Sequence, residues 1–240
     1  MNETKNISTR RSFLGRNGLA LVAAGVLGSA ALLAEQPKPA KSQQKAKEEV
    51  SPPEDLMREH GLLNRVLLIY EETERRLRQN ADPNPHVLRS AAAIIRDFIE
   101  NYHEKLEEDN LFPRFERAGK LTELVGVLGR QHQAGRRITA EILDRQALSA
   151  IKTSGDRNRL ADNLRAFVRM YRPHEAREDT VLFPALRSII SSHEFDALGE
   201  QFEDKEHELF GDEGFEKMVD KVAGLEKTLG IYDLAMFTPK

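Results

Sequence analysis

The string HExxExxxLFP occurs twice in this chain of 240 residues, beginning at His103 and again at His174. In each copy a glutamate follows the histidine by four residues, so on an α-helix both side chains lie on one face and can reach a common point. Two further histidines, His60 and His132, precede the two copies by 43 and 42 residues. The chain therefore repeats a unit of one histidine followed by a His-x-x-x-Glu pair, with a period of 71 or 72 residues.

Apolar residues around these positions recur at intervals of three and four, which is the period of one face of an α-helix. The clearest stripe consists of Leu160, Leu164, Phe167, Tyr171 and His174. We expect four such helices, one from 54 to about 80, one from about 85 to 118, one beginning near 122 and one after a turn at 152–156. Because their connections are short, the fold class is predicted to be all-α, an antiparallel up-down four-helix bundle.

Four regions are predicted along the chain: a signal segment at 1–34, a disordered linker at 35–53, the four-helix bundle at 54–190 and a C-terminal helical extension at 191–240. The linker has four prolines and no apolar periodicity. Ser51, Pro52 and Glu54 match a helix start with a capping serine, a proline in the first turn and a capping-box glutamate. In the extension, two weaker helices at about 194–210 and 213–229 should cover one side or end of the bundle.

The first residues resemble a twin-arginine (Tat) export signal. Residues 8–15 read STRRSFLG, with Arg10 and Arg11 as the pair, and an apolar run rich in glycine and alanine follows at 18–34. The resemblance implies export of a folded protein by the Tat machinery, across the cytoplasmic membrane to the periplasm or cell envelope. The run is near the lower length limit of a membrane span, so a retained N-terminal membrane anchor is the alternative.

The composition restricts the chemistry. The chain contains no cysteine, so any metal must be held by nitrogen and oxygen ligands. The formal net charge of −3 becomes more negative without residues 1–34, which carry four basic groups and one acidic group. A nucleic-acid-binding protein is expected to have a basic surplus, so no nucleic-acid partner is expected.

Placed on the apolar stripes of one bundle, a set of histidines and glutamates would enter its core: His60, His103, Glu107, His132, His174 and Glu178. A buried, ionised glutamate without compensating charge is costly, and no basic residue recurs on these stripes. Metal cations can supply that charge. A lone core histidine is more often hydrogen-bonded than metal-bound, but the repetition of the whole set at one period favours a metal site.

If both carboxylates bridge, this set offers four donor atoms to each of two metals. Iron favours about six ligands, so positions remain for a shared oxo or hydroxo bridge and for a small exogenous molecule. Non-haem iron (Fe²⁺/Fe³⁺) suits these ligands best, with manganese or zinc as alternatives.

The polar residues next to the predicted ligands are not expected to bind the metal. Glu104 and Glu175, one residue after each histidine, turn about 100° away from it and should be solvated or lie around the ligands. Core packing is favoured over a redox role for two tyrosines, Tyr102 and Tyr171. A solvated acidic face is predicted for Glu108, Asp109 and Asp179. The remaining histidines, His86, His193 and His207, are predicted at the surface.

The ordered set H, HxxxE, H, HxxxE on four helices resembles the haemerythrin-like HHE cation-binding domain, a non-haem di-iron four-helix bundle. The resemblance covers about residues 54–186. It implies that the six residues named above are iron ligands, with Glu107 and Glu178 bridging.

Two features depart from that family pattern. Oxygen-carrying haemerythrins have a further histidine one turn after the third-helix ligand, where this chain has Arg136. The missing ligand argues against reversible oxygen carriage. In addition, Arg172 and Pro173 separate Tyr171 from His174, and a proline there should kink or bulge the fourth helix.

Three functions remain open from the sequence. The leading hypothesis is an exported di-iron protein that binds, senses or scavenges a small diatomic ligand or a peroxide, namely O₂, NO or peroxide. A di-iron oxidase or peroxidase is the enzymatic alternative, since an open iron site can activate oxygen. The third is a metal-storing or metal-free helical module that contacts a partner through its linker and C-terminal extension.

Overall fold

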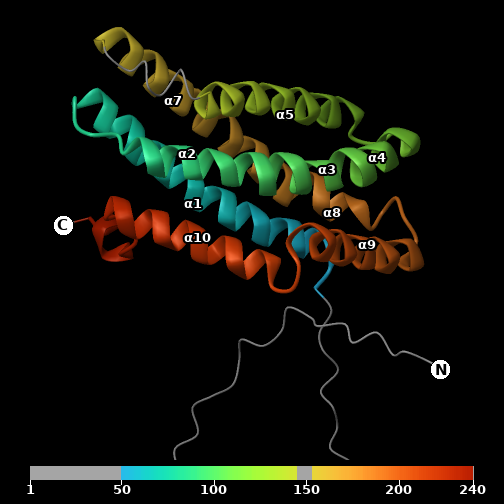
Figure 1. Ribbon diagram of the computed structural model, residues 1–240. Helices are drawn as coiled ribbons and strands as arrows, with labels where there is room; N and C mark the ends of the chain where they lie inside the picture. Colours follow the sequence, from blue (N-terminus) through green and yellow to red (C-terminus); the bar gives the residue numbers. More distant parts are fainter. Residues whose placement is uncertain (1–49, 145–152, 240) are drawn as a thin grey trace, which may run out of the picture. The chain divides into compact units, whose positions relative to one another are not determined.

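The computed structural model describes residues 50–144 and 153–239, and these residues form helices and no strand. The predicted export signal and most of the predicted linker lie outside the described residues. Four antiparallel helical segments form the bundle (Figure 1). They are α1 (Pro52–Arg78), a composite segment from Pro85 to Ala118, α5 (Thr122–Leu143) and a second composite segment from Ser154 to Leu186. The predicted all-α, up-down four-helix bundle is confirmed.

The two composite segments each contain wider π-helical turns. The first runs through α2 (Pro85–Ile94), η1 (Ile95–His103), α3 (Glu104–Leu106), η2 (Glu107–Leu111) and α4 (Phe112–Ala118). The second runs through α7 (Ser154–Arg177), η3 (Glu178–Leu182) and α8 (Phe183–Leu186). α7 continues through Pro173, and π turns begin only at Glu178. The π turns therefore begin or end at candidate ligands, as π-bulges often do at functional sites.

Local signals explain several of the helix ends. Thr153 and Asp156 form a capping box at the start of α7, since each side chain accepts a hydrogen bond from the other residue's backbone N–H. Gly119 ends α4 in the left-handed conformation, with φ of 63°. At α1, Pro52 lies in the first turn as expected, but the Ser51 side chain makes no capping hydrogen bond. The capping role predicted for Ser51 is therefore wrong.

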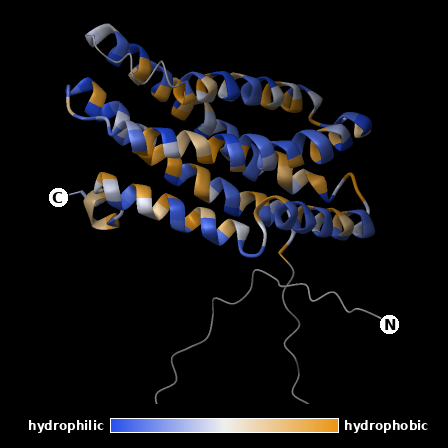
Figure 2. Cartoon of the chain, viewed as in Figure 1, coloured by the Kyte–Doolittle hydropathy of each residue, from blue (hydrophilic) through white to orange (hydrophobic). Residues whose placement is uncertain are grey.

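The apolar faces of the four segments turn inward (Figure 2). Large aromatic side chains fill the centre, and Tyr70 of α1 packs edge-on against Phe167 of α7 with ring centroids 5.3 Å apart. The core stripe predicted along the fourth segment is buried at Leu164, Phe167 and Tyr171. This packing fixes the rotation of each helix, and with it the direction of the polar side chains on the same stripes.

The C-terminal extension forms α9 (Ser192–Phe210), α10 (Gly214–Leu229) and a short turn, η4 (Leu234–Phe237). Both longer helices pack against α1, and α10 also contacts α2 (Figure 1). Arg65 of α1 donates to both carboxylate oxygens of Glu226, at 3.0 and 2.5 Å. The extension thus covers one side of the bundle. None of the described helices is both long enough and apolar enough to cross a membrane.

Candidate metal centre

All six predicted ligand residues lie together inside the bundle. Each of its four segments contributes, and every one of the six side chains is buried, with at most 4% of its surface exposed: His60, His103, Glu107, His132, His174 and Glu178. The two predicted HxxxE pairs belong to the two composite segments, and the two single histidines belong to α1 and α5. The structure therefore brings every member of the predicted set to one place.

The histidines face each other in two pairs. The Nε2 atoms of His60 and His103 lie 3.0 Å apart, and those of His132 and His174 lie 3.2 Å apart. In each pair the Nε2 atoms converge on one point, which is the arrangement that two imidazoles adopt around a shared cation.

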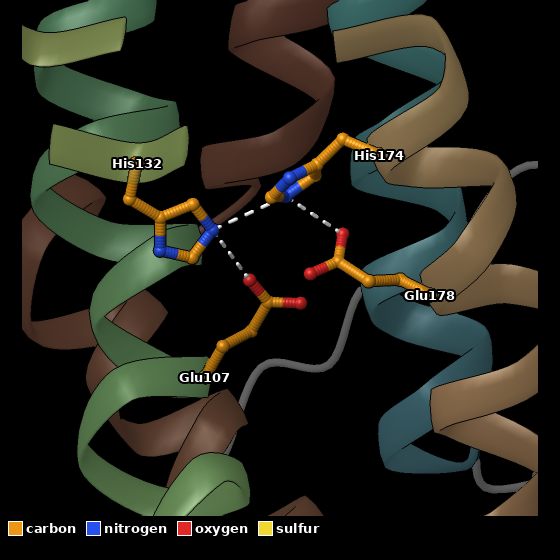
Figure 3. A group of neighbouring side chains, drawn as sticks. All are labelled: Glu107, His132, His174 and Glu178. Carbon is orange, nitrogen blue, oxygen red and sulfur yellow. Dashed lines mark hydrogen bonds and ion pairs between the residues drawn. The ribbon is translucent and has the colours of Figure 1, made fainter. Parts of the chain in front are cut away.

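Each glutamate approaches both histidine pairs. Glu107 Oε1 lies 3.9 Å from His103 Nε2, and its Oε2 lies 3.5 Å from His132 Nε2. Glu178 Oε2 lies 3.4 Å from His60 Nε2 and 3.1 Å from His174 Nε2. Figure 3 shows the half of the site in which both carboxylates point toward His132 and His174. The two carboxylates are therefore placed between the pairs, where a bridging ligand would lie.

The donor set fits a pair of cations. Both oxygens of Glu107 and both oxygens of Glu178 are buried, and none receives a well-directed hydrogen bond from the described residues. Buried carboxylates are normally hydrogen-bonded or paired, because an unsatisfied one is costly. A metal ion between each histidine pair and these oxygens would satisfy all of them at once.

Several of these residues have shifted pKa values because they are buried close to other charged groups. Burial lowers the pKa of His60, but its contacts with Asp179 and Glu178 outweigh burial and raise that pKa well above the usual value. Burial, reinforced by the charge of Glu178, raises the pKa of Glu107. The pKa of Glu178 is lowered, since contacts with His174 and His60 outweigh its burial. Without metal, a proton on His60 supplies part of the positive charge that the carboxylates require.

The outward-facing Nδ1 atom of each histidine also has a partner. The Nδ1 atoms of His60, His103, His132 and His174 lie 2.7, 2.8, 3.1 and 2.9 Å from oxygens of Asp179, Glu59, Glu108 and Gln131, respectively. Such partners fix the tautomer and orientation of a metal-bound histidine and raise its basicity. All four imidazoles are thus held with Nε2 pointing into the site.

Two of these partners lie at positions that differ from their predicted ones. Glu108 and Asp179 were expected on a solvated acidic face, but each one contacts a histidine of the site. Each immediately follows Glu107 or Glu178, the first residue of a π turn. A π turn holds more residues than an α turn, so the next residue stays closer to the same face. The other two partners, Glu59 and Gln131, were missed, although each immediately precedes a predicted histidine ligand.

Glu104 and Glu175 lie around the ligands and are buried, so the solvated alternative is wrong for both. Glu104 Oε1 accepts a hydrogen bond from the Tyr171 hydroxyl at 2.6 Å, and its Oε2 lies 2.7 Å from Arg136 Nη2. Glu175 accepts a hydrogen bond from Asn64, and burial raises the pKa of Glu175 to about 8. These contacts connect the ligand helices to one another just outside the histidines.

Arg136 points its guanidinium at acidic side chains. It pairs with Glu108 at 2.8 Å as well as with Glu104, and Glu108 in turn contacts His132. Burial raises the pKa of Glu108, but contacts with His132, Arg136 and Lys105 outweigh it and lower that pKa to about 2. Arg136 therefore acts on the site through Glu108 and supplies no ligand, because a guanidinium has no acceptor atom.

The three remaining histidines lie away from the centre. His86, His193 and His207 are exposed, as predicted, and His207 Nδ1 lies 3.2 Å from Asp212. Of the two tyrosines, both are buried in the core as expected, but Tyr171 also donates its hydroxyl proton toward Glu104.

Four antiparallel helical segments around a buried His/Glu site define a class of helical-bundle, cation-binding proteins. The family model of the Hemerythrin HHE cation binding domain matches residues 51–150 and 136–235. The chain therefore belongs to this family, whose domain binds cations, and its buried His/Glu groups can hold them.

Curated relatives share most of the chain. Two uncharacterized proteins of Mycobacterium tuberculosis and one of Mycobacterium bovis are each 49% identical to it over 221 residues, which cover 90% of this chain and 87% of each relative. No solved structure matches the chain.

Proposed function

We propose that this site holds two non-haem iron ions, one at each histidine pair, with both glutamates bridging them. One ion would be held by His60 and His103 and the other by His132 and His174, with Glu107 and Glu178 between the two pairs. The observation that supports this most is that each glutamate approaches one histidine of both pairs. A site for a single metal would need neither the second pair nor two such carboxylates.

Iron with open coordination positions supplies a redox-active Lewis acid that binds small molecules. The chain's own side chains orient the imidazoles through their Nδ1 atoms and keep bulk water from the buried ligands. Arg136 stands where oxygen-carrying haemerythrins have a further histidine, and it provides no donor in its place. The proposed centre therefore keeps room for an exogenous ligand at both metals.

We propose that the ligand is O₂, NO or peroxide, and that the protein binds, senses or scavenges it outside the cytoplasmic membrane. The paired Arg10 and Arg11 followed by an apolar run support export by the Tat machinery. Because this route carries folded proteins, the centre would be able to form before export.

An oxidase or peroxidase activity is the second candidate, and one observation favours it. The Tyr171 ring lies 5.3 Å from the His174 ring, and its hydroxyl is hydrogen-bonded to Glu104. A phenol with a carboxylate proton acceptor, next to a ligand of the proposed centre, is a suitable donor of an electron and a proton.

Metal analysis tests the proposal directly. Protein produced in iron-containing medium should carry two irons per chain, and the His103→Ala variant should carry fewer. The matched control is His207→Ala, because His207 is exposed and is not one of the six proposed ligands. Two zinc or manganese ions in place of iron would correct the metal, and protein without any metal would refute the proposal and leave the interaction module.

Turnover then separates the two candidate functions. A binding or sensing protein should form a stoichiometric complex with O₂ or NO and should not consume peroxide repeatedly. An enzyme should turn over peroxide, and Tyr171→Phe should lower the rate while keeping two irons. Multiple turnovers in the wild-type protein would therefore replace the leading function with the enzymatic one.

A further inference from the structure

The residues around the two histidine pairs are related by the internal repeat. Glu59 corresponds to Gln131, since both immediately precede a single histidine and they lie 72 residues apart. Each contacts the Nδ1 atom of the histidine in the following composite segment, Glu59 that of His103 and Gln131 that of His174. The repeat therefore places an acid in one half of the site and an amide at the same place in the other.

Because one half has the acid Glu59 where the other has the amide Gln131, the two halves of the site differ in charge. A carboxylate that accepts a hydrogen bond from Nδ1 makes an imidazole a stronger metal ligand than a neutral amide does. The Glu59 contact therefore raises the attraction for a cation at the pair that contains His103.

A second pair of corresponding residues adds to the difference. Asn64 of α1 corresponds to Arg136 of α5, again 72 residues apart. Arg136 Nη1 lies 2.8 Å from Glu108, and Lys105 lies 2.9 Å from the same carboxylate, so two cations offset the charge behind His132. Within the described parts of the chain, no lysine or arginine forms an ion pair with Asp179, the corresponding acid behind His60.

We propose that the two metal positions are inequivalent, with the His60/His103 pair filled by the first divalent cation and the His132/His174 pair by the second. Gln131 and Arg136 set this order. The inference rests on the proposed two-metal centre and adds which half binds more tightly and which residues decide it. The half with two carboxylate-backed histidines attracts the first cation. The half with one amide and a neutralised carboxylate fills at higher metal concentration.

Titration of the metal-free full chain with Co²⁺ tests this order, with heat and the visible cobalt spectrum as readouts. The wild type should bind two ions in two steps, separated by more than the statistical ratio for identical sites. Gln131→Glu should tighten the second step by about 10-fold or more, and Glu59→Gln should weaken the first step by about 10–100-fold. Thermal melts of the metal-free variants verify that each one folds.

The reciprocal double variant, Glu59→Gln with Gln131→Glu, is the matched control because it keeps the composition of the core. It should invert the order of filling. In the wild-type background, His174→Ala should keep the tight step and His103→Ala should lose it. In the reciprocal double variant, His174→Ala should lose the tight step and His103→Ala should keep it. Two equal binding steps in the wild type would overturn this inference while the two-metal proposal stands. The same would follow if the reciprocal double variant filled its two sites in the wild-type order. Failure to bind any Co²⁺ or Fe²⁺ would overturn both.

Discussion

Replacing Glu107 by leucine should stabilise the metal-free protein and remove its stabilisation by metal. The Glu107 side chain is fully buried, and neither of its carboxyl oxygens receives a hydrogen bond from the described residues. Burial and the charge of Glu178 both raise its pKa, so the folded state disfavours the ionised form. An unsatisfied buried polar group costs about 1–3 kcal/mol, and a leucine of similar size removes that cost.

The free energy of unfolding of the metal-free variant should therefore exceed that of the wild type by about 1–3 kcal/mol. In a domain of this size, each kcal/mol corresponds to roughly 2–4 °C in Tm. With metal at about 1,000 times its Kd, the wild type should gain about 4 kcal/mol, and the variant, which lacks one carboxylate of the proposed centre, should gain much less. The ranking of the two proteins should thus reverse when metal is added.

Denaturant unfolding followed by far-UV circular dichroism measures both quantities. Asp109→Leu is the control, because Asp109 is an exposed acid two residues away in the same π-helical stretch, and its change should stay within about 0.5 kcal/mol. A metal-free Glu107→Leu protein that is less stable than the wild type would refute the reasoning. So would a variant that gains as much stability from metal as the wild type does.

Two further predictions concern the bundle around the site. Burial raises the pKa of Glu100 to about 7 from the usual 4.5, so the folded state binds this proton more tightly. The stability of the metal-free protein should fall by up to about 3 kcal/mol as pH rises from about 4.5 to 7, and Glu100→Gln should reduce that fall in pH-dependent denaturation. At Gly135, an added Cβ would lie 2.1 Å from the Tyr171 hydroxyl. Gly135→Ala should therefore cost about 1–3 kcal/mol in a thermal melt, whereas Gly129→Ala, in the same helix with open space around it, should be neutral or slightly stabilising. Equal effects of the two alanines would contradict the packing assigned to Tyr171.

The four-helix bundle could be predicted because each segment has a long apolar stripe at helical spacing. The six candidate ligands could also be predicted to meet, since they continue these stripes in a repeated order. The internal repeat was needed to identify His60 and His132 as candidate ligands. Either one alone would have been interpreted as a core histidine, and only the recurrence of the whole set distinguished them.

The environment of the ligands could not be predicted from the same patterns. Glu59 and Gln131 each serve a histidine on a neighbouring helix, and a contact between helices leaves no periodic signal in either one. Glu108 and Asp179 turn toward the site because π turns begin at the residue before them, and an ideal α-helical wheel places them outside. Arg136 was recognised as a departure from the family pattern, but its contacts with Glu104 and Glu108 became evident only in three dimensions.

The measurement that tests the central claim most directly is a crystal structure of the iron-loaded protein with anomalous diffraction data collected at the iron edge. Two anomalous peaks are expected, one between His60 and His103 and the other between His132 and His174. The carboxylates of Glu107 and Glu178 should contact both peaks. A single peak, a peak at any other group of side chains, or a glutamate bound to only one of two irons would contradict the bridged di-iron centre.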